Sequence, residues 1–415
     1  MRDSSKIEIM SPAGSFDALM AAIQGGAGSV YFGAGQLNMR SRSSSNFSPE
    51  EIKQIVKICR AKDVKSYLTL NTIIYDSEIE EMMHMIDVAK DSGISAVIAS
   101  DLSVLEYARE NGVEVHISTQ CNITNLSAVK FYSRYADVMV LARELNISQI
   151  EAIAKAIREQ HICGPSGNLV RIEIFVHGAL CMAVSGKCYI SLDNFNSSAN
   201  KGACLQPCRR AYTVKDADSQ VELDIDNKYI MSPKDLMTIP ILNRLLDAGV
   251  TVLKIEGRGR SAEYVKTVTR TYHEAVEAWA TGKYTSENVD KWTTQLREVY
   301  NRGFWDGYYL GQRVGEWTEK YGSRATKVKE FIGTITNYFK DINVAEVRLE
   351  TGELSVGDDI IILGKTTGVY EDTIKEIRVD LLPVEKAIKG DMFSILTKEI
   401  IRRGDKLYKI KDAEI

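Results

Sequence analysis

Residues 173–210 read EIFVHGALCMAVSGKCYISLDNFNSSANKGACLQPCRR, and the organisation of the rest of the chain follows from this stretch. It begins within an apolar run, Ile172–Val176, which predicts a strand buried on both faces. The run breaks at His177-Gly178, and a glycine-rich loop follows. This loop carries four of the seven cysteines of the chain: Cys181, Cys188, Cys204 and Cys208. Such crowding indicates a chemical role.

The cysteine spacing is C-x6-C-x15-C-x3-C. Structural zinc sites usually use C-x2-C pairs, which this chain lacks. Iron–sulfur clusters accept wider spacings, because the corners of a cubane lie farther apart than the ligands of one ion. Gly178, Gly186 and Gly202 would let the backbone fold closely around such a group. The pattern favours an iron–sulfur cluster, while zinc and redox-active or buried thiols stay open.

Chain length and composition set the broad class. A chain of 415 residues exceeds what one hydrophobic core usually serves, which predicts two domains. Hydrophobic residues make up 44% and charged residues 26%, as in globular proteins. The sequence has no apolar run of about 18 residues, so we expect no membrane partner.

The N-terminal sequence, MRDSSKIEIMSPAG, enters a strand pattern directly and shows no signal-peptide h-region. We therefore expect a cytoplasmic protein, in which thiols stay reduced and clustered cysteines more often bind metal than pair. The net charge is −4, so the molecule as a whole does not attract nucleic acid. Any contact with RNA requires a local basic patch.

Eight short β-rich runs alternate with stretches of helical periodicity such as Phe16–Ile23. This alternation predicts a (β/α)₈ TIM-like barrel, with a doubly wound open sheet as the alternative. Helix starts are marked at Ser48-Pro49 and at Ser232-Pro233. The predicted strands are Ile7–Met10, Ser29–Gly33, Lys65–Asn71, Ala96–Ser100, Glu114–Thr119, Val138–Ala142, Arg171–Gly178 and Thr251–Gly257.

The alternation fails after the seventh strand. About 70 residues separate strands seven and eight, against the usual ~30 of a βαβ unit. We therefore predict a cysteine-rich insertion over about residues 179–230, ending in a hairpin over Tyr212–Ile230. The insertion follows the C-terminal end of a strand, which is the catalytic face of this fold.

The pattern of predicted secondary structure changes towards the C-terminus. Residues 301–321 are rich in Gly, Trp and Tyr and are interpreted as an ordered connector. From about residue 327, short β runs separated by turns predict a small antiparallel β-barrel. We place the domains at 1–322 and 323–415. Residues 347–364, VRLETGELSVGDDIIILG, resemble part of the second-domain barrel of translation elongation factors. In those factors, this barrel contacts RNA.

Four segments carry a resemblance to a known family: residues 173–191, 201–210, 232–236 and 253–258. They resemble the signature of the collagenase-like peptidase family, number 32 of the unassigned ("U") type. The resemblance covers essentially the whole chain and is strongest to the tRNA hydroxylation protein P branch of that family. It implies a (β/α)₈-like domain and a [4Fe–4S] cluster held by Cys181, Cys188, Cys204 and Cys208.

The same resemblance implies an activity, the 5-hydroxylation of the wobble uridine of tRNA with prephenate as hydroxyl donor. The partners would then be the tRNA anticodon region and a small dicarboxylate. Extracting a base from a single-stranded loop costs little, so such a substrate is physically reasonable. Two other functions stay open: a collagenase-like peptidase and a noncatalytic tRNA-binding module.

A peptidase would need a nucleophile and a base. The chain has neither the HExxH motif nor the G-x-S-x-G motif. The nearest pair is His177 and Cys181, and a thiol that binds iron is not available to attack a peptide bond. The sequence therefore favours the hydroxylase over the peptidase.

The remaining candidate residues follow predicted strands, at the expected catalytic rim. His177, Gln120 and Asn71 are the catalytic candidates, with turn or helix-cap hydrogen bonding as the structural alternative. A cluster of cations is the candidate site for carboxylate or phosphate groups, because guanidinium forks bind two oxygens at once. Local ion pairs such as Glu256–Arg258 are the alternative there. These cations are Arg40, Arg42, Arg143, Lys254 and Arg258.

Overall fold

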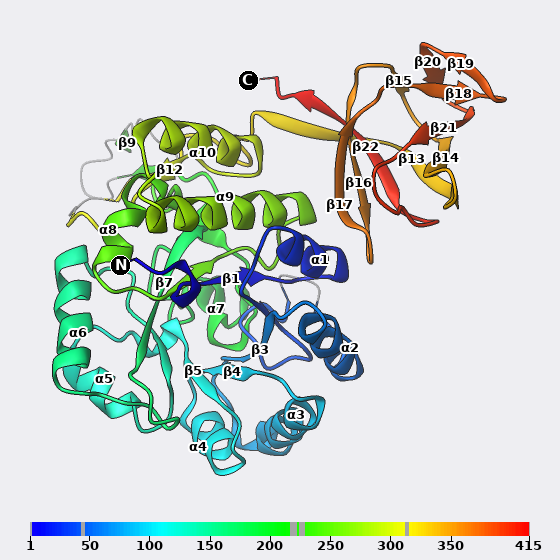
Figure 1. Cartoon of the computed structure of the whole chain (residues 1–415). Coiled ribbons are helices and arrows are strands. Elements are labelled where there is room, and N and C mark those ends of the chain that lie inside the picture. The colour runs from blue at the N-terminus through cyan, green and yellow to red at the C-terminus, as the bar shows by residue number, and fades with distance from the viewer. Residues whose placement is uncertain (1, 43–45, 216–221, 224–228, 312–314, 415) are drawn as a thin grey trace.

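The computed structural model of the protein describes residues 2–42, 46–215, 222–223, 229–311 and 315–414. Eight parallel strands form a closed barrel, because the last of them pairs with both the first and the seventh. Closure confirms the predicted TIM-like barrel and excludes the open sheet (Figure 1). The barrel strands are β1 (Glu8–Pro12), β2 (Ser29–Phe32), β3 (Lys65–Leu70), β4 (Ala96–Ala99), β5 (Val115–Ile117), β6 (Val138–Val140), β7 (Arg171–Gly178) and β11 (Val252–Ile255).

Helices surround the barrel, and most of them pack an apolar stripe towards the strands. The predicted start of the second helix is confirmed: the backbone N–H of Ser48 donates to the Glu51 carboxylate at 2.8 Å, with Pro49 in the first turn. The helices of this layer are α1 (Phe16–Gln24), α2 (Pro49–Arg60), α3 (Ile79–Ser92), α4 (Leu102–Glu110), α5 (Leu126–Tyr132), α6 (Ile147–Glu159), α8 (Leu242–Asp247), α9 (Ala262–Ala280) and α10 (Ser286–Glu298).

The insertion after β7 folds back over the barrel mouth. It contains the short helix α7 (Ile190–Phe195) and two single helical turns. Gly202 has φ +72°, and a Cβ there would lie 2.2 Å from the carbonyl oxygen of Asn38. Only glycine therefore lets the insertion approach the β2–α2 loop this closely. The predicted hairpin is confirmed where β8 (Val214–Lys215) pairs with β9 (Glu222–Leu223); its other residues, 216–221 and 224–228, lie outside the described residues.

One predicted helix is wrong. Ser232-Pro233 precedes a strand, β10 (Asp235–Met237), which pairs antiparallel with the end of β7 and parallel with β12 (Phe304–Trp305). Tertiary pairing overrides the local helix signal here, since the buried Asp235 must reach Arg302, 3.2 Å away. In the connector, the structure describes residues 301–311 and 315–321, and Trp305 among them is buried.

The C-terminal unit is antiparallel, as predicted, and has its own apolar core. Its main sheet runs in the order β17-β16-β22-β13-β14-β21-β18-β19, and within the described residues no pairing joins β17 to β19. The strands are β13 (Lys327–Phe339), β14 (Val344–Leu349), β15 (Glu353–Ser355), β16 (Asp359–Gly364), β17 (Gly368–Thr373), β18 (Ile377–Val379), β19 (Leu382–Val384), β20 (Lys386–Ile388), β21 (Met392–Leu396) and β22 (Lys406–Asp412).

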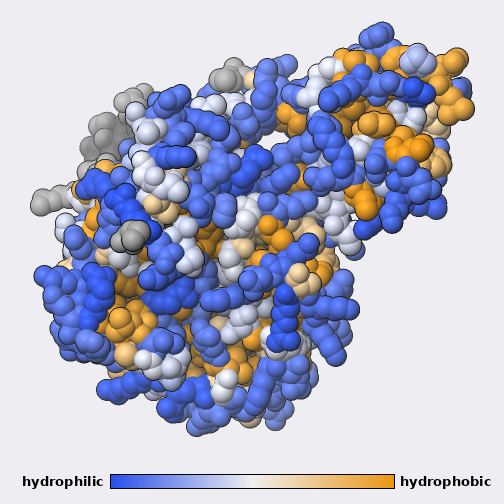
Figure 2. Space-filling view, viewed as in Figure 1, coloured by the Kyte–Doolittle hydropathy of each residue, from blue (hydrophilic) through white to orange (hydrophobic). Residues whose placement is uncertain are grey.

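The C-terminal unit docks on the barrel through β17, beside α1 and α9 (Figure 1). The Gln24 side chain donates to the carbonyl of Thr367 and accepts from the N–H of Val369, at 2.9 and 3.0 Å. Figure 2 shows hydrophobic surface on this unit, where Leu381 and Leu382 are exposed. In the described part of the chain, no helix combines the length and apolar character that crossing a bilayer requires.

Candidate active site

A cavity of about 270 Å³ lies where the C-terminal ends of the barrel strands meet the insertion. Its wall combines loops from the start of the chain with residues that follow the last strand, so the fold assembles it from segments far apart in sequence. The cavity brings together ten of the twelve predicted site residues: Arg40, Asn71, Gln120, Arg143, Cys181, Cys188, Cys204, Cys208, Lys254 and Arg258. His177 and Arg42 are not among its lining residues.

The four clustered cysteines all face this cavity. Cys181 is exposed and the other three are half-buried, with all four thiols free. Burial raises the pKa of the Cys208 thiol, Arg209 opposes that rise, and the other three cysteines add to it as neighbouring negative charges. The four sulfurs therefore share one electrostatic environment.

The thiols surround the cavity without meeting at one point. Among the described residues, no group of three or more His, Cys, Asp or Glu side chains is arranged to hold a metal ion. Four thiols facing one space are the kind of donor set that an iron–sulfur cluster requires, because the corners of a cluster lie farther apart than the ligands of a single ion. The remaining cysteines do not line the cavity; Cys59 is buried in the α2 core stripe.

Positive charge dominates the cavity wall. Six arginines and Lys254 line it, and Glu256 is the carboxylate among the described lining residues. Arg40 pairs with Glu256 at 2.8 Å. Burial alone would raise the pKa of Glu256, but Arg40, Arg260 and Arg143 hold it at about 2. Glu256 is thus ionised.

Two other cations of the wall pair with carboxylates that do not line the cavity, Arg302 with Asp235 and Lys254 with Glu173. The seven cations still exceed these three carboxylates, which suits an anionic ligand.

Arg143 combines burial with an unused donor. Its guanidinium lies 3.8 Å from the centroid of the Phe175 ring, and one terminal nitrogen donates to the carbonyl of Ala179 at 3.1 Å. Its Nε is buried and has no hydrogen-bond partner within the described part of the chain. Burial lowers the pKa of this side chain. A ligand oxygen at Nε would relieve that burial cost.

Arg258 instead holds the cavity wall together. Its Nη1 donates to Asn38 Oδ1 at 3.0 Å and to Thr69 Oγ1 at 2.9 Å. Burial lowers its pKa to about 10. The alternative of a local Glu256–Arg258 pair is not what the structure shows, because Glu256 accepts from Arg40.

Asn71 and Gln120 are joined through Ser118. The Asn71 Nδ2 donates to Ser118 Oγ at 3.2 Å, and Ser118 Oγ donates to the Gln120 side-chain oxygen. The Asn71 Oδ1 also accepts from the N–H of Met39 at 3.2 Å. These amides are therefore held in fixed orientations on the cavity wall, and their catalytic role stays a prediction.

His177 lies away from the cavity lining and is buried. Its ring packs against Tyr264, Tyr272 and Phe304, with ring centroids 5.5–6.0 Å apart. Burial, aided by the positive charge of Arg260, lowers the pKa of His177 to about 3. The imidazole is thus neutral at neutral pH, and no described contact joins it to Cys181. This geometry gives no support to a Cys–His nucleophile pair.

A second depression adjoins the cavity, and we call it the cationic groove. It has a volume of about 550 Å³ and shares Cys204, Gln206, Arg209 and Arg302 with the cavity wall. Arg42, the predicted site residue outside the cavity, lines this groove, and the described lining residues include no Asp or Glu. The other cations and aromatic residues of the groove are Arg210, Lys320, Tyr300 and Tyr321.

The charged cavity residues that the sequence did not predict include Glu256, Arg260 and Arg302. Arg260 follows the last barrel strand within EGRGR, so its position after a strand could have indicated it. The sequence indicates Glu256 only as a local ion-pair partner of Arg258. Arg302 lies in the connector, and no local pattern links it to the barrel; it reaches the site through its ion pair with Asp235.

The fold and site together define a class: a TIM-like barrel with four cysteines and an excess of arginines at its C-terminal end. The chain belongs to peptidase family U32, whose model matches residues 14–319. This finding confirms the family resemblance carried by the cysteine loop.

Relatives in this family carry names of two kinds. The chain is 58% identical to a collagenase of Porphyromonas gingivalis strain W83, over 98% of each chain. It is 28% identical to tRNA hydroxylation protein P1 of Bacillus subtilis strain 168, over 90% of this chain and 87% of the relative. It is also 34% identical to the 23S rRNA 5-hydroxycytidine C2501 synthase of Escherichia coli K12, over 75% of this chain and 46% of that relative.

Proposed function

We propose that the protein is an iron–sulfur tRNA hydroxylase that forms 5-hydroxyuridine at the wobble position with prephenate as hydroxyl donor. The observation that carries this proposal is the convergence of four cysteines and seven cations on one cavity at the C-terminal end of the barrel. The named hydroxylation activities of the Bacillus subtilis and Escherichia coli relatives support the same chemistry.

The four cavity cysteines are the proposed ligands of a [4Fe–4S] cluster. As thiolates they would repel one another, and this repulsion adds to burial in raising the pKa of Cys208; iron would balance that charge. With a cysteine on each iron, such a cluster would supply one-electron chemistry. The arginines on the same wall would compensate the net negative charge of the bound group.

The donor is proposed to bind through its carboxylates. Arg143 offers an unpartnered, buried Nε, and Lys254, whose ammonium group also donates to Glu173 at 2.7 Å, lies on the same wall. Two separated cationic groups match the two carboxylates of a small dicarboxylate better than a single phosphate. Prephenate satisfies that requirement.

The cationic groove is the proposed path of the RNA backbone. It has cations for phosphates and exposed aromatic surface, Tyr321 being 75% exposed, on which a base could stack. Because the overall charge is −4, attraction of RNA has to come from such a local patch. A base extracted from a single-stranded loop could then enter the adjoining cavity. The C-terminal unit, residues 323–415, is proposed to assist docking of the tRNA.

The direct test uses anaerobically purified protein with its cluster, undermodified tRNA and prephenate. We expect mass spectrometry of the digested tRNA to show one added oxygen on the wobble uridine, dependent on prephenate. Omitting prephenate is the matched control. Tight tRNA binding with no added oxygen under any donor would instead support the noncatalytic binding module.

A collagenase-like peptidase is the second candidate, favoured by the 58% identity to a protein of that name. The test is gelatin cleavage by the same preparation, with Cys181→Ser and His177→Ala as variants. The buried, neutral His177 predicts no cleavage above that of a sample from a strain without the gene. Cleavage that both substitutions abolish would favour the peptidase.

A further inference from the structure

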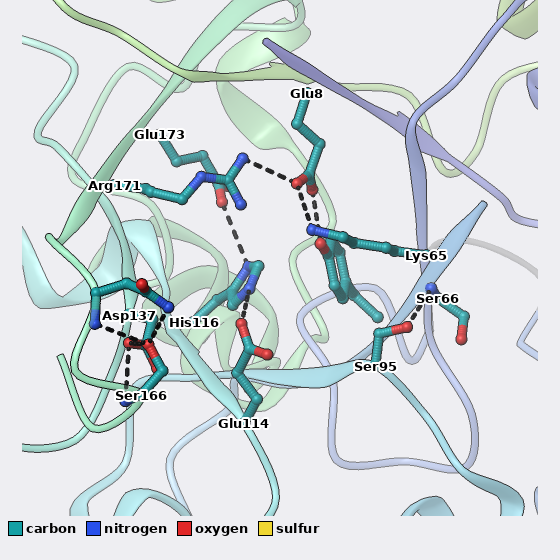
Figure 3. Close-up of polar contacts among 12 residues, drawn as sticks. Glu8, Lys65, Ser66, Ser95, Glu114, His116, Asp137, Ser166, Arg171 and Glu173 are labelled. Carbon is teal, nitrogen blue, oxygen red and sulfur yellow. Dashed lines mark hydrogen bonds and ion pairs between the residues drawn. The ribbon is translucent and has the colours of Figure 1, made fainter. Parts of the chain in front are cut away.

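The interior of the barrel contains ionisable side chains where such barrels usually hold branched apolar residues. Figure 3 shows several of them, projecting towards the barrel axis from β1, β3, β5 and β7, which alternate around the barrel. His116 on β5 and Glu173 on β7 are fully buried, and Lys254 on β11 is 5% exposed. Burying such groups is costly unless they are paired, so their arrangement calls for an explanation.

One carboxylate at the N-terminal end of the barrel is already saturated. Glu8 accepts from Arg171 at 2.9 Å, from Lys65 at 3.2 Å and from the Tyr67 hydroxyl at 2.6 Å. Burial alone would raise the pKa of Glu8, but Arg171 and Lys65 lower it to about 2. Glu8 therefore stays ionised and anchors this end without exchanging protons (Figure 3).

A second set of groups runs along the barrel axis. Glu114, with a side chain 48% exposed at the N-terminal end, lies 3.4 Å from Nε2 of His116. Nδ1 of that histidine lies 3.8 Å from Oε2 of Glu173. The other oxygen of Glu173 accepts from Nζ of Lys254 at 2.7 Å, and Lys254 lines the cavity. Titratable groups thus connect the solvent at one barrel end with the cavity at the other.

The centre of this series has an unused donor and acceptor. His116 Nδ1 and Glu173 Oε2 are both buried, and neither has a hydrogen-bond partner in the described part of the chain. They face each other just beyond hydrogen-bond distance, so a shift of under about 1 Å would join them. A purely structural ion pair would be expected to close this gap, because leaving two buried polar atoms unsatisfied is costly.

We propose that Glu114, His116, Glu173 and Lys254 form a proton path between the N-terminal end of the barrel and the cavity. A proton arriving through Glu114 binds His116 Nε2, and the imidazole releases the proton on Nδ1 to Glu173 Oε2. Glu173 passes a proton to Lys254 as the ammonium gives one to the cavity. One proton enters and one leaves, with no electrons moved; a ring flip restores the first tautomer.

The surroundings of His116 support a titrating group. Burial alone would lower its pKa, but the contact with Glu114 and the negative charges of Glu173 and Glu8 raise it above the ordinary value. The proposal goes beyond the proposed function, because it holds for any reaction in the cavity that takes up or releases a proton. The charged and titratable groups that face His116 are Glu8, Tyr67, Glu114 and Glu173.

The test measures exchange of the His116 ring N–H with water by NMR on the full chain, labelled with ¹⁵N in its histidines. Loss of a signal in His116→Gln assigns the resonance. We expect fast exchange despite complete burial, slowed about tenfold or more in Glu114→Gln. Exchange remaining in Glu114→Gln comes from the cavity side, so adding Glu173→Gln should slow it further.

His177 is the internal reference, since it is also buried but packs against aromatic rings. Its exchange should stay slow in every variant, and circular dichroism confirms that each variant is folded. Protection of His116 equal to that of His177 would overturn the path. The path would also be overturned if the His116 ring N–H exchanges as fast in Glu114→Gln as in the wild type. It would equally be overturned if exchange in the double variant with Glu173→Gln is no slower than in Glu114→Gln alone. Since no activity is measured, the result is independent of the proposed hydroxylation.

Discussion

The two ends of the barrel use the same residue types differently. At the N-terminal end, the Glu8 carboxylate is satisfied by Arg171, Lys65 and Tyr67. At the C-terminal end, six arginines and Lys254 face the cavity with Glu256 as the lining carboxylate among the described residues. At the N-terminal end, the charged groups are paired with one another and stabilise the fold. At the C-terminal end, cations outnumber carboxylates, so positive charge remains available for a ligand, and four thiols line the same cavity.

The largest difference between the two ends concerns the cysteines. Cys208→Ser removes one of the four proposed ligands, so we expect iron in the anaerobically purified protein to fall from about four atoms per chain to a small fraction of that. The measurements are iron analysis and the visible absorption spectrum. Cys163→Ser is the matched control, because Cys163 is exposed and does not line the cavity. Full iron content in Cys208→Ser would contradict the assignment.

The N-terminal end should respond through stability. The pKa of Glu8 falls from 4.5 to about 2 on folding, which corresponds to on the order of 3 kcal/mol. A lowered folded pKa stabilises above the unfolded value of 4.5, and this contribution is lost as pH falls towards about 2. Glu8→Gln should therefore unfold at a lower temperature than the wild type at neutral pH, and the difference in unfolding temperature should shrink as the pH is lowered.

Calorimetry over this pH range measures the effect, and the iron content should be unchanged because Glu8 does not line the cavity. If the difference in unfolding temperature between wild type and Glu8→Gln does not change with pH, the lost stability comes from packing and not from the charge of Glu8.

Removing one cavity cation should affect ligand binding more than folding. Arg143→Met keeps much of the apolar stem over Phe175 but removes the guanidinium. We expect the KM for prephenate to rise about tenfold or more, equivalent to about 1.4 kcal/mol, with little change in melting temperature. Steady-state kinetics of tRNA hydroxylation provides the measurement. An unchanged KM would place the donor carboxylates elsewhere.

The smallest effects belong to the cationic groove, where each cation contributes separately. Arg42→Ala, Arg210→Ala and Lys320→Ala should each weaken tRNA binding by about threefold and reduce the salt dependence by about one phosphate contact. Lys155→Ala is the matched control, because Lys155 is exposed on α6 and does not line the groove. Equal losses in the control and the groove variants would remove the groove from RNA binding.

Much of the composition of the C-terminal end of the barrel could be predicted from the sequence. Parallel strands in a closed barrel bring all their C-terminal ends to one face, so polar residues after strands two, three, five, six and eight converge there. That rule indicates Arg40, Asn71, Gln120, Arg143 and Arg258, and the crowding of the four cysteines in one loop indicates the rest, to which the resemblance adds a cluster.

Other features depend on contacts that no local pattern encodes. The β10 strand replaces a predicted helix because it pairs with β7 and β12, which lie far away in sequence. Arg302 enters the cavity from the connector for the same reason. The alignment of His116 with Glu173 depends on strands that are not adjacent in the barrel, since β6 lies between them. His177 follows β7 as expected, yet its ring turns into the aromatic core.

The proposed role of the cysteine and arginine cavity is to hydroxylate a tRNA base. The decisive experiment is mass spectrometry of tRNA from a deletion strain that also lacks other members of the family, complemented with either the wild-type gene or Cys208→Ser. We predict that 5-hydroxyuridine and its derivatives at the wobble position disappear on deletion, return with the wild type and stay absent with Cys208→Ser. Unchanged wobble hydroxylation in the deletion strain would contradict the account.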